Sequence, residues 1–156
     1  MISPRGGSWS ADSVILYAPT VLGPLWQVAD SGQGAPIRVT RLELPDRGAH
    51  LFPQFLPDGH RFLFYVRGNP DDQGIHLGSL GSEKTTRLTA AATAGAYLAP
   101  GWLLVLDGAL VARRFDTSRG ELSSEPVTVV NPVGLTRWGT LELFRPRRAP
   151  WSTGRV

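Results

Sequence analysis

The chain has 156 residues, of which 42% are hydrophobic and 19% are charged, and it contains no cysteine. This length suits one domain, and the composition excludes a disordered chain. The lack of cysteine excludes disulfide bonds, cysteine zinc sites and a thiol nucleophile. The 18 glycines and 13 prolines favour many short strands joined by turns, so we expect an all-β fold.

The formal net charge of +3 is concentrated at one end of the chain. Residues 1–130 hold 11 Lys and Arg against 12 Asp and Glu, whereas residues 131–156 hold five Arg against Glu142 alone. A nucleic-acid-binding protein usually carries its basic residues on the folded body. We therefore expect no nucleic-acid partner.

The sequence shows no targeting or membrane segment. The N-terminal stretch "MISPRGGSWSADS" lacks the apolar centre of a secretory signal, and no apolar run reaches the roughly 18 residues of a membrane helix. We expect a chain that carries no localisation signal, and its compartment stays unknown.

The first predicted unit covers residues 7–45. It begins with "GSWSADSVILYA" (7–18), in which an aromatic residue is followed by a turn and then by an apolar strand. The flatter strand "PLWQVADSG" (24–32) and the short strand "IRVTRL" (37–42) come next. The pattern predicts four strands.

The second unit covers residues 50–90 and repeats this order. "PQFLPDGHRFLFYV" (53–66) contains a strong Pro-Asp-Gly turn between an aromatic residue and an apolar strand. "GIHLGSLGS" (74–82) and "TTRLT" (85–89) predict the last two strands of this unit.

The third unit covers residues 94–131. "GAYLAPGWLLVLD" (95–107) is followed by "ALVARRFDT" (109–117) and by "PVTVV" (126–130). Here Ala99-Pro100-Gly101 replaces the Pro-Asp-Gly turn. The order of aromatic residue, turn and apolar strand is nevertheless kept.

The three units align on the turn. Each aromatic residue stands four positions before the turn position, and the turn positions are 46 and 42 residues apart, which is close to the period of a four-stranded propeller blade. The apolar strands do not alternate in polarity, so we expect both of their faces to be covered by neighbouring sheets. We also expect Asp12 and Asp58 to accept backbone N–H bonds. The structural residues predicted for the repeat turns are Trp9, Asp12, Phe55, Pro57, Asp58, Gly59, Tyr97 and Gly101.

These motifs resemble the β-propeller repeats of TolB-like, WD-type proteins, through Trp9–Ser13, Phe55–Gly59 and the closing Arg87-Leu88-Thr89. More narrowly, residues 6–134 are similar to the propeller region that follows the kinase domain in bacterial serine/threonine protein kinases. The resemblance implies a partial β-propeller of about three blades in residues 1–134. It also implies a protein or peptide partner, a sensing or interaction role, and a parent protein with an extracytoplasmic propeller anchored to a membrane.

Three blades leave two end faces uncovered, so we expect further blades or self-association to cover them. Residues 135–156 do not continue the pattern and predict an irregular or disordered Arg-rich tail. Two interpretations of this tail stay open. One is a frameshift that replaced the original sequence, and the other is a genuine basic extension.

Few side chains of the sequence are candidates for a catalytic or binding role. His50 and Gln54 lie near the start of the second unit, where propellers bind ligands around their central opening, and they are the candidate binding residues. We expect structural or solvent roles for His60 and His76, and a solvated hairpin tip at Asp71-Asp72. Neither a Gly-x-Ser-x-Gly motif nor the kinase motifs occur.

The sequence therefore predicts a non-catalytic module that needs no metal and no cofactor. Two alternatives stay open. The chain could belong to an enzyme-associated propeller, with a gating or hydrolytic role, or it could be a truncated gene product without function.

Overall fold

The computed structural model describes residues 5–42, 48–122 and 125–130. These residues form thirteen β-strands and no helix, so the predicted all-β class is confirmed. The strands form three antiparallel sheets, and none of these sheets closes on itself. Because the described residues contain no helix, they also contain none that is long and apolar enough to cross a membrane.

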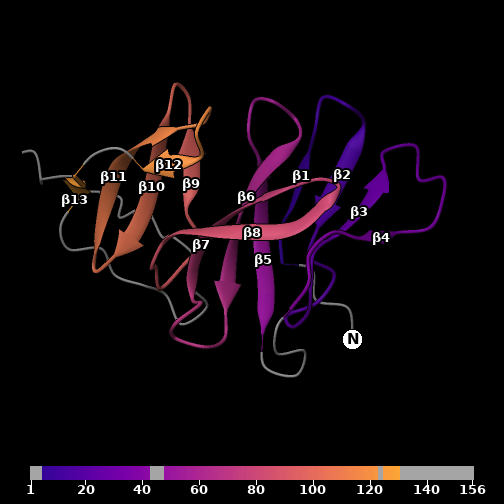
Figure 1. Cartoon of the computed structure of the whole chain (residues 1–156), viewed down its shortest axis with the longest axis horizontal. Helices are drawn as coiled ribbons and strands as arrows, with labels where there is room; N and C mark the ends of the chain where they lie inside the picture. Colours follow the sequence, from indigo (N-terminus) through magenta and orange to yellow (C-terminus); the bar gives the residue numbers. More distant parts are fainter. Residues whose placement is uncertain (1–4, 43–47, 123–124, 131–156) are drawn as a thin grey trace, which may run out of the picture.

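Each sheet uses strands that are consecutive in the chain (Figure 1). The first sheet contains β1 (Gly7–Trp9), β2 (Val14–Tyr17), β3 (Trp26–Ala29) and β4 (Ile37–Arg38). The second contains β5 (Ala49–Phe55), β6 (Arg61–Arg67), β7 (Gly74–Ser79) and β8 (Ser82–Thr89). The third contains β9 (Ala96–Leu98), β10 (Trp102–Asp107) and β11 (Ala109–Asp116), with β12 (Glu121–Leu122) and β13 (Val127–Val130) both paired to β11.

The three sheets lie side by side in chain order, with the second sheet between the other two (Figure 1). The turns that follow the first strand of each sheet, β1–β2, β5–β6 and β9–β10, all lie along the upper edge in this view. The arrangement therefore brings the repeated turns to one end of the molecule.

The repeat seen in the sequence has a backbone counterpart at these turns. Ser13, Gly59 and Gly101 hold the same turn position, and their φ angles are 61°, 68° and 103°. Glycine adopts this left-handed conformation at little cost, whereas serine adopts it less readily. The same bend therefore begins the second strand of all three sheets.

Burial along the apolar strands shows how the sheets stack. Residues 62–66 of β6 are all buried, so both faces of the middle sheet are covered, as predicted. In β2 of the first sheet only Leu16 is buried. In β10 Leu103 and Val105 are buried and Leu104 between them is half-buried, but Leu106 on the same face as Leu104 is buried as well. Among the described residues, each end sheet has a neighbouring sheet on one face, and the expectation of two covered faces is confirmed for the middle sheet.

Contacts identify the two faces of the middle sheet. The Phe64 ring packs against His50, which is hydrogen-bonded to Thr40 beyond the first sheet's last strand. The hydroxyl of Tyr65 donates instead to the carbonyl oxygen of Ala92, just before the third sheet. Alternate residues of β6 thus point to opposite neighbours, as the pleat of a strand requires.

Candidate functional site

A hollow of about 370 Å³ lies where the first strands of the three sheets end. All three sheets contribute to its wall, the first two with a strand end and its turn, and the third with Tyr97 of β9. The lining residues are Ser8, Trp9, Ser10, Ala11, Gln54, Phe55, Leu56, Pro57, Gly59 and Tyr97. The three repeat aromatics and one of the two candidate binding residues, Gln54, therefore meet at one place.

Hydrogen bonds from a side chain of one sheet to the backbone of the next stabilise the wall of the hollow. This bridge is found between the first and second sheets and again between the second and third. The Ser8 hydroxyl oxygen accepts a hydrogen bond from the backbone N–H of Phe55 at 2.9 Å. The Gln54 side chain accepts one from the N–H of Tyr97 at 2.8 Å, and its own Nε2 donates to the Tyr97 carbonyl at 3.1 Å. Ser8 and Gln54 both directly precede the repeat aromatic of their own sheet. In each case the residue at that position binds the aromatic residue of the next sheet.

The turn of the second sheet is organised by Asp58. Its Oδ1 accepts hydrogen bonds from the N–H groups of His60 at 2.9 Å and Arg61 at 2.8 Å, and its Oδ2 pairs with Arg61 Nε at 2.7 Å. Burial acts to raise the pKa of this carboxyl, but the two N–H groups and the guanidinium together hold it below its ordinary value. The expected role of Asp58 is seen in these contacts.

In the first sheet a different side chain makes the corresponding bonds. The Ser10 hydroxyl oxygen accepts from the N–H groups of Asp12 and Val14. Asp12 lies instead against the neighbouring turn, where its Oδ2 would be 3.2 Å from a Cβ atom at Gly59. The two turns are therefore packed closely at the edge of the hollow.

The lining of the hollow is chemically neutral. Among the described residues, its lining contains aromatic residues, a proline and two serines, and it contains no charged residue and no histidine. None of the described lining residues could act as a base for Ser8 or Ser10, whose oxygens already accept backbone hydrogen bonds. Across the described parts of the chain, no group of three or more acidic or histidine side chains could hold a metal ion. The hollow therefore suits neutral ligand groups.

His50, the other candidate binding residue, is placed elsewhere. It lies at the start of β5, whereas the hollow lies at the end of that strand. Its side chain is buried between the first two sheets, with Nδ1 2.7 Å from the hydroxyl oxygen of Thr40, which also accepts from the N–H of Leu25. Burial, reinforced by nearby His76, lowers the pKa of His50 to about 4, so the ring is neutral at physiological pH.

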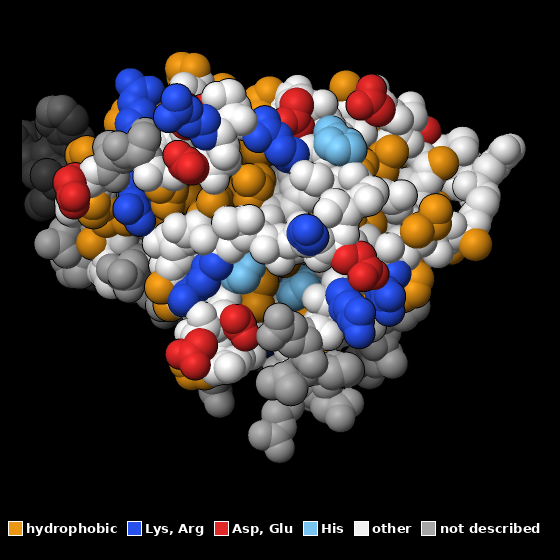
Figure 2. Space-filling view, viewed as in Figure 1, with side chains coloured by type: hydrophobic (Ala, Val, Ile, Leu, Met, Phe, Trp, Pro, Cys, Tyr) orange, Lys and Arg blue, Asp and Glu red, His pale blue; other side chains and the backbone are white. Residues whose placement is uncertain are grey.

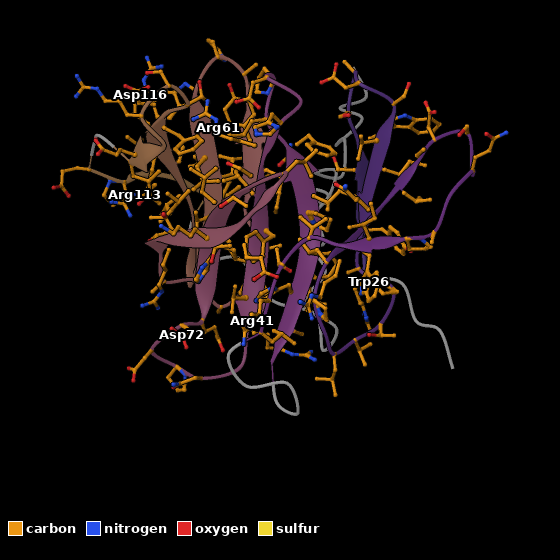
Figure 3. The ribbon with its side chains drawn as sticks, turned by 45° about the vertical axis from the view of Figure 1, so that its right-hand side comes forward. Trp26, Arg41, Arg61, Asp72, Arg113 and Asp116 are labelled. Carbon is orange, nitrogen blue, oxygen red and sulfur yellow. The ribbon has the colours of Figure 1, made fainter. Side chains whose placement is uncertain are left out.

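The remaining candidates are spread over the second sheet. His60 is exposed at the β5–β6 turn, and His76 is buried in β7, where its Nε2 donates to the carbonyl of Asp72 at 2.7 Å. Asp71 and Asp72 form the β6–β7 turn, held by Asn69. Figure 3 labels Arg61 and Asp72 at opposite ends of this sheet. The structure does not bring these groups together.

Ser8 and Ser10, which line the hollow, and Thr40, the partner of His50, were not predicted from the sequence. One signal was present, because Ser8 and Gln54 align when the repeat aromatics are superposed. The predicted tail at residues 135–156 lies outside the described residues.

Comparison of the chain with family models, with curated proteins and with solved structures finds no match.

Proposed function

We propose that the three sheets are consecutive blades of a β-propeller and that the chain is a non-catalytic segment that binds a protein or peptide partner. On this proposal it is part of a larger bacterial signalling protein of the kinase-associated type. Three features support the propeller. The sheets are meanders in chain order, they lie side by side, and the middle sheet is buried on both faces.

The observation that carries the binding role is the neutral hollow at the shared end of β1, β5 and β9. Sites for peptides combine apolar and aromatic walls with a few polar groups that fix the orientation of the ligand. Here the hydroxyl oxygen of the half-buried Ser8 already accepts a backbone bond, so its O–H group is left to donate to a peptide carbonyl. We expect a neutral peptide segment to bind in this hollow.

Ala11 allows a test that leaves the fold intact. It is exposed and lines the hollow, so Ala11→Arg introduces a long charged side chain into the site without disturbing the core. Gln33→Arg is the matched control, since Gln33 is exposed between β3 and β4 and does not line the hollow.

The experiment selects a displayed library of random peptides on the immobilised chain. We expect peptides that bind the wild type and Gln33→Arg but are lost on Ala11→Arg, with equal melting temperatures for all three proteins. A wild type that enriches no peptide, or peptides that bind Ala11→Arg equally well, would show that the hollow is not a peptide site.

A further inference from the structure

The face of the first sheet that is turned away from the second sheet is apolar and lacks a partner among the described residues. The strand register places Trp9 opposite Ile15, and Tyr17 opposite Trp26. Leu16 points to the other face and is fully buried against the second sheet. Trp9, by contrast, is 64% exposed. We call this surface the leading face, and Figure 3 labels Trp26 on this sheet.

The equivalent face is buried in both following sheets. Phe55 and Tyr97 are equivalent to Trp9, and they lie opposite Phe62 and Leu103, both of which are fully buried. The aromatic residue of the repeat therefore packs toward the preceding sheet wherever such a sheet is present.

The backbone of β1 also lacks a contact that the first strands of the other two sheets make. The N–H of Ser10 donates to Val14 within the sheet, so the N–H of its neighbour Trp9 points to the free edge of β1. The equivalent N–H groups of Phe55 and Tyr97 donate to the side chains of Ser8 and Gln54 in the preceding sheet. The N–H of Trp9 could therefore donate the same hydrogen bond to a side chain of a sheet packed in front of the first sheet.

The third sheet exposes the complementary half of this interface. Leu16, Leu63 and Leu104 hold the same position in the three sheets, and the first two are buried against the next sheet, while Leu104 is only half-buried. On the same face as Leu104, Leu98 is 48% exposed and Val130 is 49% exposed, whereas Leu106 and Ala112 are buried. We call this surface the trailing face. Hydrophobic side chains (orange) are visible over both end sheets in Figure 2.

We propose that the trailing face of one copy of this chain packs on the leading face of a second copy, in a head-to-tail contact. The two faces are the two halves of an interface that the chain already forms twice internally, so the contact continues a packing mode present in the structure. A head-to-tail contact either closes into a ring or continues as a filament. The inference rests on the stacking of the sheets and does not need the peptide-binding role. It concerns this chain by itself, since in a longer propeller further blades would cover the same two faces.

The residue at position 96 indicates that this contact between copies is weaker than the contacts between sheets within one chain. Ala96 stands where Ser8 and Gln54 stand in the other sheets, directly before the repeat aromatic. Its methyl group cannot accept a hydrogen bond from the Trp9 N–H of the next copy. Ala96→Gln should supply the missing bridge and tighten association about fivefold, the effect of one net hydrogen bond.

The test measures the mass of the full chain by sedimentation over a range of concentrations. We expect the wild-type mass to rise above that of the monomer as concentration increases. Leu98→Glu should weaken association about tenfold or more, because it introduces a charge into an apolar contact. Ile37→Glu is the matched control, because Ile37 is 60% exposed and its register with Gln27 and Leu16 places it off the leading face, so it should leave association unchanged.

Ala96→Gln should tighten association, whereas Ala90→Gln, an exposed control before β9, should not. Val130→Glu provides a second disruptive variant if Leu98→Glu does not fold. A wild type that stays monomeric at every concentration would overturn the proposal and leave the two faces for a further sheet or another protein. Association that survives both Leu98→Glu and Val130→Glu would also overturn it.

Discussion

Both polar atoms of the Gln54 side chain bind the backbone of Tyr97, one accepting from its N–H at 2.8 Å and the other donating to its carbonyl at 3.1 Å. These two bonds join β5 to β9, although Gln54 and Tyr97 are 43 positions apart in the sequence. A single amide side chain therefore connects the first strands of two sheets beside the hollow.

Replacing Gln54 should loosen this connection. We expect Gln54→Ala to lower the free energy of unfolding by about 1–3 kcal/mol, because two hydrogen bonds are lost and the N–H of Tyr97 loses its partner. Gln54→Glu should cost less, since a carboxylate still accepts from that N–H. Urea unfolding measures both, with exposed Gln33→Ala as the control. Equal stability of Gln54→Ala and wild type would contradict this role.

The buried His50 should make stability depend on pH. Its pKa falls from an ordinary 6.5 to about 4 in the folded chain, so the unfolded chain binds a proton first as the solution is acidified. The contribution of the neutral His50 to the free energy of unfolding is therefore fully present above about pH 6.5. The free energy of unfolding should fall by up to about 3 kcal/mol as the pH drops to about 4. The lowered pKa of His76 acts in the same direction. Urea unfolding at several pH values measures the change.

His50→Asn separates this effect from general acid sensitivity. Its amide oxygen can take the place of Nδ1 beside the Thr40 hydroxyl, but it does not titrate. We expect a shallower loss of stability between about pH 6.5 and 4 in this variant than in the wild type. An NMR titration that places the midpoint of His50 at or above its ordinary value would refute the burial argument.

Gly78 should not accept a side chain. A Cβ atom there would lie 2.7 Å from Cζ and 2.8 Å from Cε2 of Phe62, inside the contact between the first two sheets. We expect Gly78→Ala to cost about 1–3 kcal/mol through overpacking. Gly7→Ala is a matched strand control, because its nearest contact would be an ordinary 3.4 Å from the Leu16 carbonyl oxygen. Thermal unfolding compares them, and similar costs at both positions would argue against the packing explanation.

The turn of the second sheet should depend on an acceptor oxygen at Asp58. We expect Asp58→Ala to destabilise the chain by about 1 kcal/mol, since the N–H groups of His60 and Arg61 lose their partner. Asp58→Asn keeps the Oδ1 acceptor and should recover most of this loss. Asp71→Ala, at the exposed β6–β7 turn, is the control and should change stability by less than about 0.5 kcal/mol. Chemical denaturation is the measurement, and equal effects of Asp58→Ala and Asp58→Asn would be inconsistent with this account.

The all-β class and the three-sheet arrangement were predictable because they depend on local signals. Turn residues, strand-forming residues and the spacing of Trp9, Phe55 and Tyr97 are all visible in the sequence. The turn conformation shared by Ser13, Gly59 and Gly101 follows the same spacing. The partner of each side chain could not be predicted in this way, since Ser8 and Gln54 bind residues of another sheet.

His50 and Gln54 show what only the tertiary structure decided. From the sequence they are four positions apart on one strand, and an even spacing places both on the same face of a regular strand. The pairing of β5 with β6 shifts register between Leu51 and Gln54, and Phe52 there has a φ of 51°. This β-bulge turns His50 toward the first sheet and Gln54 toward the third. The sequence by itself determined the strands and their turns, but an irregularity of one strand decided which candidate residue was buried and which reached the hollow.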